Sequence, residues 1–246
     1  MSFTSRFANP GKFLWLAERL MPWFAGASLL AFGVGLTLTL FHSPVDYQQG
    51  ETVRIMYVHV PAAWLGLMIY AAMVVVACVG LIMRHTLADI FCTAAAPVGA
   101  LFVALCLITG SIWGHPTWGA WWVWDARLTS VLVLFLIYCG VIVLRRSFDD
   151  HASGFRSSAI LILVGGVNIP IVHFSVNWWN TLHQPSGLLR LSGSTVDVHM
   201  LRPLLVMALA YVFFAAFLVL MRMKTEILKR RIEAALLLDE DNGPLM

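Results

Sequence analysis

Six long apolar stretches dominate the chain, and short segments richer in polar residues separate them. Each stretch is close to the ~20 residues that an α-helix needs to cross the hydrocarbon core of a bilayer. They occupy residues 22–41, 61–83, 93–113, 128–144, 157–176 and 201–221. The pattern predicts an all-α integral membrane protein with about six transmembrane helices. Pro61 stands where the first turn of a helix tolerates proline.

The two ends of the chain are more polar than these stretches. Residues 1–20 form a basic lead-in that we expect to lie along the membrane surface. The first apolar stretch is too long for a signal peptide and lacks a small-residue cleavage site, so we interpret it as a retained helix. Residues 224–238 have opposite charges four residues apart, which favours an amphipathic helix lying on the membrane. Contact between this tail and a cytoplasmic partner is the alternative.

The composition supports a membrane protein and excludes several other classes. The 246 residues are 60% hydrophobic and only 12% charged, whereas soluble domains have about 25% charged residues. The net charge of +3 is too small to indicate nucleic-acid binding. The cysteines form neither CxxC nor CxxCH, so a disulfide framework, a zinc site and covalently attached haem are unsupported. We expect buried, inert thiols at Cys78, Cys92, Cys106 and Cys139.

The distribution of lysine and arginine predicts the orientation, because cytoplasmic loops carry an excess of these residues. With the N-terminus inside, the inner segments hold 12 of the 16 basic residues and the outer segments hold Arg54, Arg127, Arg190 and Arg202. Both termini are therefore predicted to be cytoplasmic. The segments around residues 42–60, 113–127 and 177–200 are predicted to face outward.

The most unusual stretch lies in an outer segment and contains four tryptophans within seven positions. It reads Trp118-Gly119-Ala120-Trp121-Trp122-Val123-Trp124-Asp125-Ala126-Arg127, and Trp113 lies just upstream. Tryptophan is common at membrane interfaces, and an ordinary aromatic belt is one interpretation. A belt needs fewer rings than this. An aromatic shelf beside a carboxylate and a guanidinium suits a large planar ligand with charged edges, such as haem.

Two of the eight histidines are the best candidates for ligands of haem iron, which often takes axial imidazoles. His59 and His183 are each predicted within a few residues of an outer helix end and beside aromatic residues. His85 and His151 fall on inner loops and are expected to be solvated. His42, His115 and His199 have no obvious structured setting, and His173 could satisfy a backbone carbonyl.

Other polar residues in the outer segments could complete a haem site. Arg127 and Arg54 are the cations best placed in sequence to pair with propionates, and Asp125 is expected to orient a neighbouring Arg or Trp N–H group. Pro170 should bend the fifth helix beside Asn168. The bend either serves packing alone or aims His183, Trp178 and Trp179 at the shelf.

These residues resemble the WWD family of haem-handling membrane proteins, and in particular the CcmC (haem exporter protein C) branch of bacterial cytochrome c maturation. The long string from Trp118 to Thr129 carries most of the resemblance. Three weaker patches add to it, and the likeness extends over about residues 22–223. The patches are Asp46-Tyr-Gln-Gln-Gly50, Tyr57-Val-His-Val-Pro-Ala62 and Trp178-Trp-Asn-Thr-Leu-His-Gln184.

The resemblance implies a function, a cofactor and partners. It implies a haem-handling domain over residues 1–223 and a location in the bacterial inner membrane. Residues 224–246 are expected to form a cytoplasmic tail from the charge distribution, and the resemblance is not carried onto them. Family members hold non-covalent haem b at the periplasmic face and pass it to the periplasmic chaperone CcmE, together with CcmA, CcmB and CcmD. The axial ligands map onto His59 and His183, and the WWD segment onto residues 113–127. No GxxxxGK[ST] motif is present, so ATP-driven transport would need another subunit.

Two alternatives remain open from the sequence. One is the WWD synthase branch, which attaches haem covalently to apocytochrome and usually reads Asp-Pro-Lys where this chain has Asp125-Ala126-Arg127. The other is a quinone-linked b-type cytochrome subunit, which usually holds haem between histidines inside its helices. Here only His173 falls inside a predicted span.

Overall fold

The computed structural model describes residues 9–183 and 196–241, and over these ranges the chain is built from helices joined by short loops. An isolated bridge between Asp46 and Gly50 is the only strand-like pairing in the described ranges. Six helical segments are long and apolar enough to cross a membrane, which confirms the predicted class and number. The helices are α2 (Pro10–Thr37), α3 (Met56–Met83), α4 (Thr86–Trp118), α5 (Ala126–Arg146), α6 (His151–Gly165), α7 (Asn168–Trp178) and α8 (Val198–Asp241).

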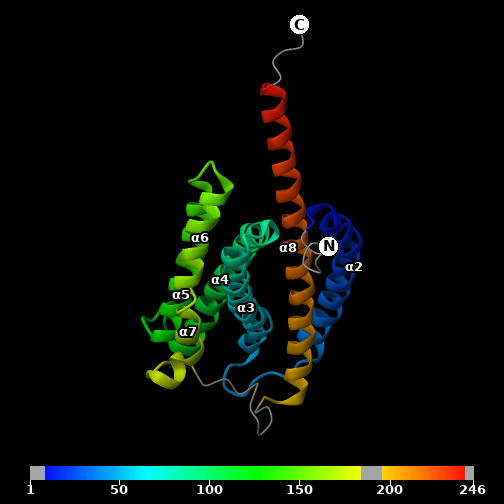
Figure 1. Cartoon of the computed structure of the whole chain (residues 1–246). Helices are drawn as coiled ribbons and strands as arrows, with labels where there is room; N and C mark the ends of the chain where they lie inside the picture. The colour runs from blue at the N-terminus through cyan, green and yellow to red at the C-terminus, as the bar shows by residue number, and fades with distance from the viewer. Residues whose placement is uncertain (1–8, 184–195, 242–246) are drawn as a thin grey trace.

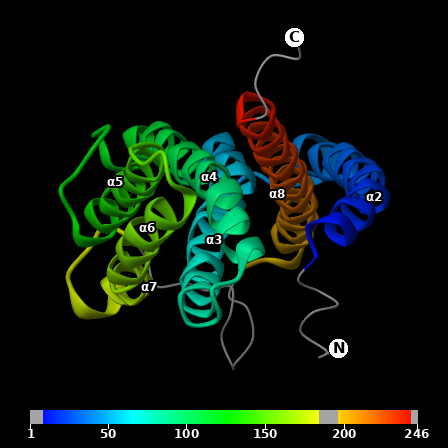
Figure 2. The same ribbon diagram turned by 45° about the horizontal axis from the view of Figure 1, so that its top comes forward.

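The helices form a bundle with the α3–α4 hairpin at its centre (Figures 1 and 2). α5, α6 and α7 pack on one side of this hairpin, while α8 packs on the other side and carries α2 against its outer face. Short loops make successive spans antiparallel. The bundle therefore has two ends: α3, α5 and α8 begin at one, and the other carries most of the arginines.

Two tyrosines hold the centre of the bundle together. The Tyr70 and Tyr138 rings are fully buried and meet edge to face, with centroids 5.0 Å apart. The Tyr70 hydroxyl donates to the Ile162 carbonyl of α6, and the Tyr138 hydroxyl donates to the Gly66 carbonyl of α3. These bonds satisfy buried polar groups that have no access to water. A Cβ at Gly99 would lie 2.2 Å from the Tyr138 hydroxyl, so this close packing requires glycine there.

Several helices begin earlier than the apolar pattern predicted. α2 starts at Pro10, where the Asn9 side chain accepts a hydrogen bond from the Gly11 amide, and it runs through Pro22. The described part of the lead-in is therefore helix continuous with the first span, not a separate surface segment. α3 starts at Met56 after a 3₁₀ turn, Glu51–Ile55, so Pro61 lies inside the helix instead of in its first turn. A polar cap sets the start of α2 and a preceding 3₁₀ turn sets the start of α3, and hydropathy alone reveals neither.

The fifth span is interrupted, as the proline predicted. α6 ends at Gly165 and α7 begins at Asn168, which places Pro170 in the first turn of α7, where a missing N–H is tolerated. The Asn168 amide donates to the Ser130 carbonyl of α5 over 2.9 Å. The side-chain amide of Asn168 therefore has a hydrogen-bond partner, as expected for a kink that serves packing. The bend also directs α7 towards the start of α5.

The tail does not lie on the membrane surface, and that prediction was wrong. α8 is one helix of 44 residues, about 66 Å long at 1.5 Å per residue, and it projects beyond the other helices (Figure 1). The predicted pairs are present: Glu226 contacts Arg230 at 2.7 Å and Lys229 contacts Glu233 at 3.6 Å. The proposed boundary at residue 223 falls inside this helix.

All four cysteines are free thiols, but their burial differs from the prediction. Cys92 and Cys106 are buried as expected, whereas Cys78 is exposed and Cys139 is half-buried. The expectation of burial failed because apolar helix faces in this protein also point outward, towards the lipid.

Candidate functional site

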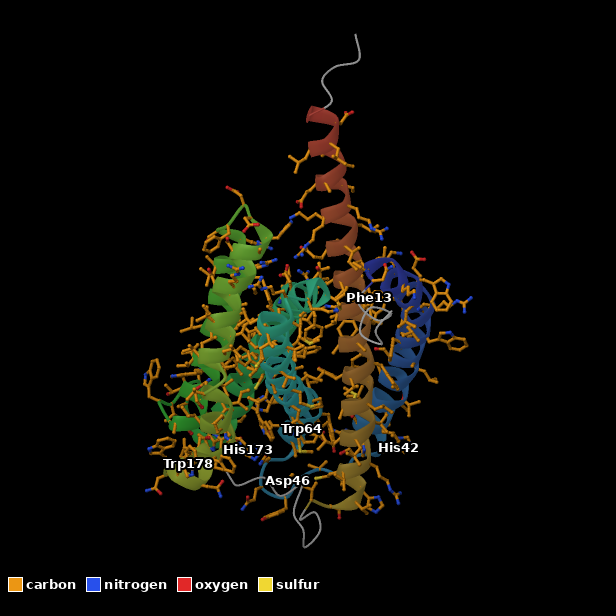
Figure 3. The ribbon with its side chains drawn as sticks, in the orientation of Figure 1. Phe13, His42, Asp46, Trp64, His173 and Trp178 are labelled. Atoms are coloured by element: carbon orange, nitrogen blue, oxygen red, sulfur yellow. The ribbon has the colours of Figure 1, made fainter. Side chains whose placement is uncertain are left out.

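The candidate residues gather at one end of the bundle, which we call the histidine end after His59 and His183. Figure 3 shows His42, Asp46, His173 and Trp178 at this end. The opposite end, which we call the basic end, includes Arg84, Arg145 and Arg146 at the ends of α3 and α5. Arg190 and Gln184, which the sequence analysis named, lie outside the described residues.

His59 lies in the first turn of α3 and faces α4. Its Nδ1 atom lies 3.1 Å from the Thr109 hydroxyl, which itself donates to the Leu105 carbonyl at 2.7 Å. A hydroxyl has one proton to give, so Thr109 accepts from His59, and the His59 proton lies on Nδ1. This tautomer leaves the Nε2 lone pair available. A Cβ at Gly110 would lie 2.9 Å from the His59 ring, so the glycine makes room for the imidazole.

A polar turn before α3 fixes the aromatic neighbour of His59. The His59 ring meets Trp113 edge to face, with centroids 5.6 Å apart. The Trp113 indole N–H donates to the Gln49 side-chain oxygen over 2.8 Å. Asp46 accepts from the amides of Gln48 and Gln49, so the turn is held by its own first residue.

His183 is held in the same manner from the other side of the site. Its Nδ1 lies 3.3 Å from an Asp125 carboxylate oxygen, and the Trp118 ring meets the imidazole at 5.0 Å between centroids. A carboxylate only accepts, so the His183 proton also lies on Nδ1 and Nε2 is available. Burial lowers the pKa of His183 below its usual value, although the charge and the hydrogen bond of Asp125 oppose this shift. The imidazole is therefore neutral at pH 7.

Asp125 joins three segments of the chain. It is buried and caps α5 by accepting from the Leu128 amide at 2.7 Å. Its second oxygen accepts from the Leu182 amide and from His183. Sequence reasoning assigned it an orienting role towards an Arg or Trp N–H group, whereas the structure shows that it orients a histidine.

Arg127 and Arg54, both proposed as propionate partners, have different surroundings. Arg127 donates to the Ser175 hydroxyl and to the carbonyls of Val172 and His173, which ties α5 to α7. Its charge acts on both His59 and His183. Arg54 forms an ion pair with Glu51 and donates to two carbonyls at the end of the first span. Of the two arginines, Arg127 is thus the one beside the histidines.

The tryptophans divide into two groups by what they contact. Trp113 and Trp118 contact the histidines, whereas Trp121, Trp122 and Trp124 line an open apolar groove of about 550 Å³. The groove also involves Leu107, Ile108, Ser111 and Ile112 of α4, which at 3.6 residues per turn lie opposite Thr109 and Trp113. The Trp122 indole N–H is buried without an acceptor among the described residues.

Trp178 and Trp179 lie at the end of α7, and more than half of the Trp178 side chain is exposed. In the described part of the chain, their ring contacts are with each other and, for Trp178, with Phe174. The bend in the fifth span therefore brings Ser175 to Arg127, but it does not stack these two rings on the WWD tryptophans.

Three of the remaining outer histidines have other settings. The exposed His115 ring stacks on Trp121 at 4.2 Å, beside the groove. His42 lies near the Thr37 carbonyl at the end of the first span, and His173 contacts Phe174. His59 and His183 thus differ from these three in having a side-chain acceptor at Nδ1 and an available Nε2.

Comparison with known sequences identifies the family. The sequence profile described as CcmC, Heme exporter protein C, matches residues 3–237. The chain belongs to the CcmC family. It is 49% identical over 227 residues to Heme exporter protein C of Bradyrhizobium diazoefficiens, which covers 92% of this chain and 86% of that protein. Identity to Heme exporter protein C of Escherichia coli is 46%, over 91% of each chain.

A relative outside the bacteria has a similar sequence. The Marchantia polymorpha protein named as a putative cytochrome c biosynthesis ccmC-like mitochondrial protein is 47% identical over 180 residues, covering 73% of this chain and 76% of that protein. CcmC family membership implies a role in haem export for cytochrome c maturation. The family match also includes most of the 224–246 tail, which the sequence resemblance had left out.

Residues that sequence reasoning missed are those that support the histidines. Thr109, Gly110 and Gln49 hold or accommodate His59 and Trp113. Gln49 belongs to one of the weaker resemblance patches, so a signal for it existed. Thr109 is an ordinary helical threonine in the sequence, and only the packing of α3 against α4 reveals its role.

Proposed function

We propose that the protein binds haem b non-covalently at the periplasmic face of the bacterial inner membrane and delivers it to the periplasmic chaperone CcmE for cytochrome c maturation. His59 and His183 are the proposed axial ligands, and Arg127 is the proposed partner of a propionate. CcmA, CcmB and CcmD are the proposed partners in the membrane. The basic end would then face the cytoplasm, consistent with the positive-inside rule.

One observation carries this proposal: both histidines engage a side-chain acceptor through Nδ1 and keep Nε2 available. Histidines that bind metals usually donate their other N–H to such a partner, which fixes the tautomer and raises the basicity of the ligating nitrogen. The charge of Arg127 acts on both His59 and His183, so this guanidinium lies within electrostatic reach of the two imidazoles.

The surrounding residues also suit the apolar ring and the charged edge of haem. Trp113 and Trp118 provide apolar ring surface beside the two imidazoles. When bound, haem would supply an iron that accepts both imidazole nitrogens. The chain's own contribution is to keep both imidazoles neutral and oriented, and to place a guanidinium beside them.

Delivery requires that the site release its cargo, and the environment of His183 supports such a step. His183 lies in the loop after α7, whereas His59 lies in a helix packed against α4. Loops move more readily than packed helices. We therefore assign His183 as the imidazole that is exchanged first for a ligand from the receiving protein.

The test is the optical spectrum and haem content of protein purified from cells. His59→Ala and His183→Ala should each lower haem retention and convert a low-spin spectrum to an altered or high-spin one. Added imidazole should partly restore both properties by occupying the vacant position. His42→Ala and His115→Ala are matched controls at the same end and should behave as wild type. A wild-type low-spin spectrum with full haem content in both axial variants would refute the assignment and make His115 or His199 the next candidate.

A further inference from the structure

A second cavity lies at the basic end of the bundle, between α4, α5, α8 and the loop after α5. Its volume is about 780 Å³, within the range of small-molecule sites. On α4 it reaches from Cys92 to Pro97, whereas the histidine site begins at Thr109. Twelve residues of helix separate Pro97 from Thr109, or about 18 Å, so the cavity and the histidine site are distinct.

The wall of the cavity has two chemical zones. Nearer the middle of the bundle it is apolar and formed by Ala96, Pro97, Val141 and Ile142. Towards the basic end, α5 and α8 contribute cations, and Phe148, Leu236 and Leu237 add apolar surface. A ligand that fits both zones has an apolar body and a polar group at one end.

The cations of the wall differ in how far they are already neutralised. They are Arg145, Arg146, Arg222, Lys229 and Arg230. Arg145 pairs with Asp89 and donates to Thr93 and to the His151 carbonyl. Within the described residues, Arg146 and Arg222 have no carboxylate partner.

Arg230 adds an unmet hydrogen-bond donor. Its guanidinium contacts Asp89 and Glu226, each at 2.7 Å, but its Nη2 is buried with no acceptor among the described residues. Burying a charged donor without an acceptor is costly.

The carboxylates of the wall do not cancel this charge. Glu226 is paired with Arg230, and Glu233 lies between His151 and Lys229. Asp149 also faces the cavity, and Asp89 pairs with both Arg145 and Arg230, so four carboxylates stand against five cations. The cavity keeps an excess of one positive charge.

We propose that this cavity binds an acidic amphiphile, with its carboxylate or phosphate on Arg146 and Arg222 and its apolar body against Ala96, Pro97, Val141 and Ile142. Two sources have this chemistry. One is an anionic phospholipid, since basic pockets between transmembrane helices bind such headgroups. The other is haem, whose two propionates are carboxylates. The proposal does not depend on the histidine site.

The lipid arm of the test uses full-length protein in phosphatidylcholine nanodiscs that contain phosphatidylglycerol. Native mass spectrometry measures how much phosphatidylglycerol each variant retains. The Arg146→Gln/Arg222→Gln pair should retain less than wild type, by about five-fold for each arginine removed. Arg146→Lys/Arg222→Lys keeps the charge and should retain most of it. Arg84→Gln, an exposed arginine at the same end outside the cavity, is the matched control and should equal wild type.

The haem arm uses His59→Ala/His183→Ala as the background, so that the histidine site does not contribute. Haemin is titrated into this protein with and without the Arg146→Gln/Arg222→Gln pair. Residual binding that disappears with the arginines identifies haem as the ligand. Because the lipid arm contains no haem, failure of the histidine assignment leaves its result intact.

The proposal is overturned if neither phosphatidylglycerol retention nor residual haemin binding changes with Arg146 and Arg222. It is also overturned if Arg84→Gln lowers lipid retention as much as the cavity pair does, because the attraction is then a general property of this surface. Should the double variant fail to fold, Arg146→Gln alone decides, since this arginine is exposed. It should still lower retention about five-fold.

Discussion

Replacing Thr109 by valine is expected to loosen haem without disturbing the fold. Valine has nearly the same shape as threonine but lacks the hydroxyl that accepts the His59 Nδ1 proton at 3.1 Å. The Thr109 hydroxyl also donates to the Leu105 carbonyl. That carbonyl already accepts a backbone N–H within the helix, so losing the hydroxyl's bond to it costs little. The variant therefore removes the orientation of His59 while the imidazole itself remains.

The size of the effect follows from the kind of bond that is lost. A hydrogen bond between neutral groups contributes about 0.5–1.5 kcal/mol net, which corresponds to roughly 2- to 12-fold in affinity. Loss of a supporting partner of a metal-binding histidine typically costs about 10–100-fold. The smaller range applies here, because the Cys106 carbonyl also interacts with the His59 ring and can take over the proton. We expect haem retention to weaken about 3- to 10-fold.

Thr117→Val is the matched control for this measurement. Thr117 lies eight residues further along α4 and donates to the Trp113 carbonyl, as Thr109 does to Leu105. Both proteins are purified, their haem content is measured, and the rate of haem loss to an excess of apomyoglobin is compared. If Thr109→Val and Thr117→Val lose haem at the same rate, the Nδ1 contact does not support the ligand and the tautomer argument fails.

Three further outcomes are expected. A cysteine at Ala120 should react with an impermeant thiol reagent in intact spheroplasts, and labelling only after lysis would contradict the predicted orientation. Trp118→Ala should lower haem retention more than Trp124→Ala, since only Trp118 contacts a candidate ligand; equal losses in haem content would contradict the two-group division. Because burial lowers the pKa of His183, this imidazole stays neutral as the pH falls to its usual value of about 6.5. Spectra recorded against pH should show haem loss only below that value, and loss above it would contradict the assignment.

The number of spans could be predicted because hydropathy reports burial in lipid, and every span of this protein is apolar for about 20 residues or more. The helix ends could not be predicted as well, because they depend on caps such as Asn9 and Asp125. The direction of the C-terminal helix relative to the membrane could not be predicted either. Charges four residues apart indicate a helix on any surface, and they do not say whether it turns along the membrane or continues outward as α8 does.

The two candidate ligands could be found from sequence, but their supporting contacts could not. His59 and His183 stand next to recognisable aromatic patches, whereas the Thr109 contact joins residues 50 positions apart.

The tryptophan string was easy to find in the sequence, but its arrangement in space was not. Its density suggested one shelf, but the end of α4 at Gly119, where φ is +74°, sends the following residues back along the helix. The Ser111 hydroxyl then holds the Trp121 carbonyl at 2.7 Å, which places the later rings on the opposite face.

Asp125 shows that the geometry of the WWD segment depends on a carboxylate as well as on tryptophans. The same carboxylate starts α5, holds the Leu182 amide and orients His183. A buried carboxylate is stable only when its hydrogen bonds are made, so the loop after α7 stabilises Asp125 while Asp125 positions that loop. Withdrawal of His183 towards a receiving protein would therefore leave one carboxylate oxygen less well satisfied while the α5 cap remains. This links release of the ligand to a local change in the loop and spares the bundle, which is the behaviour that a site for temporary cargo requires.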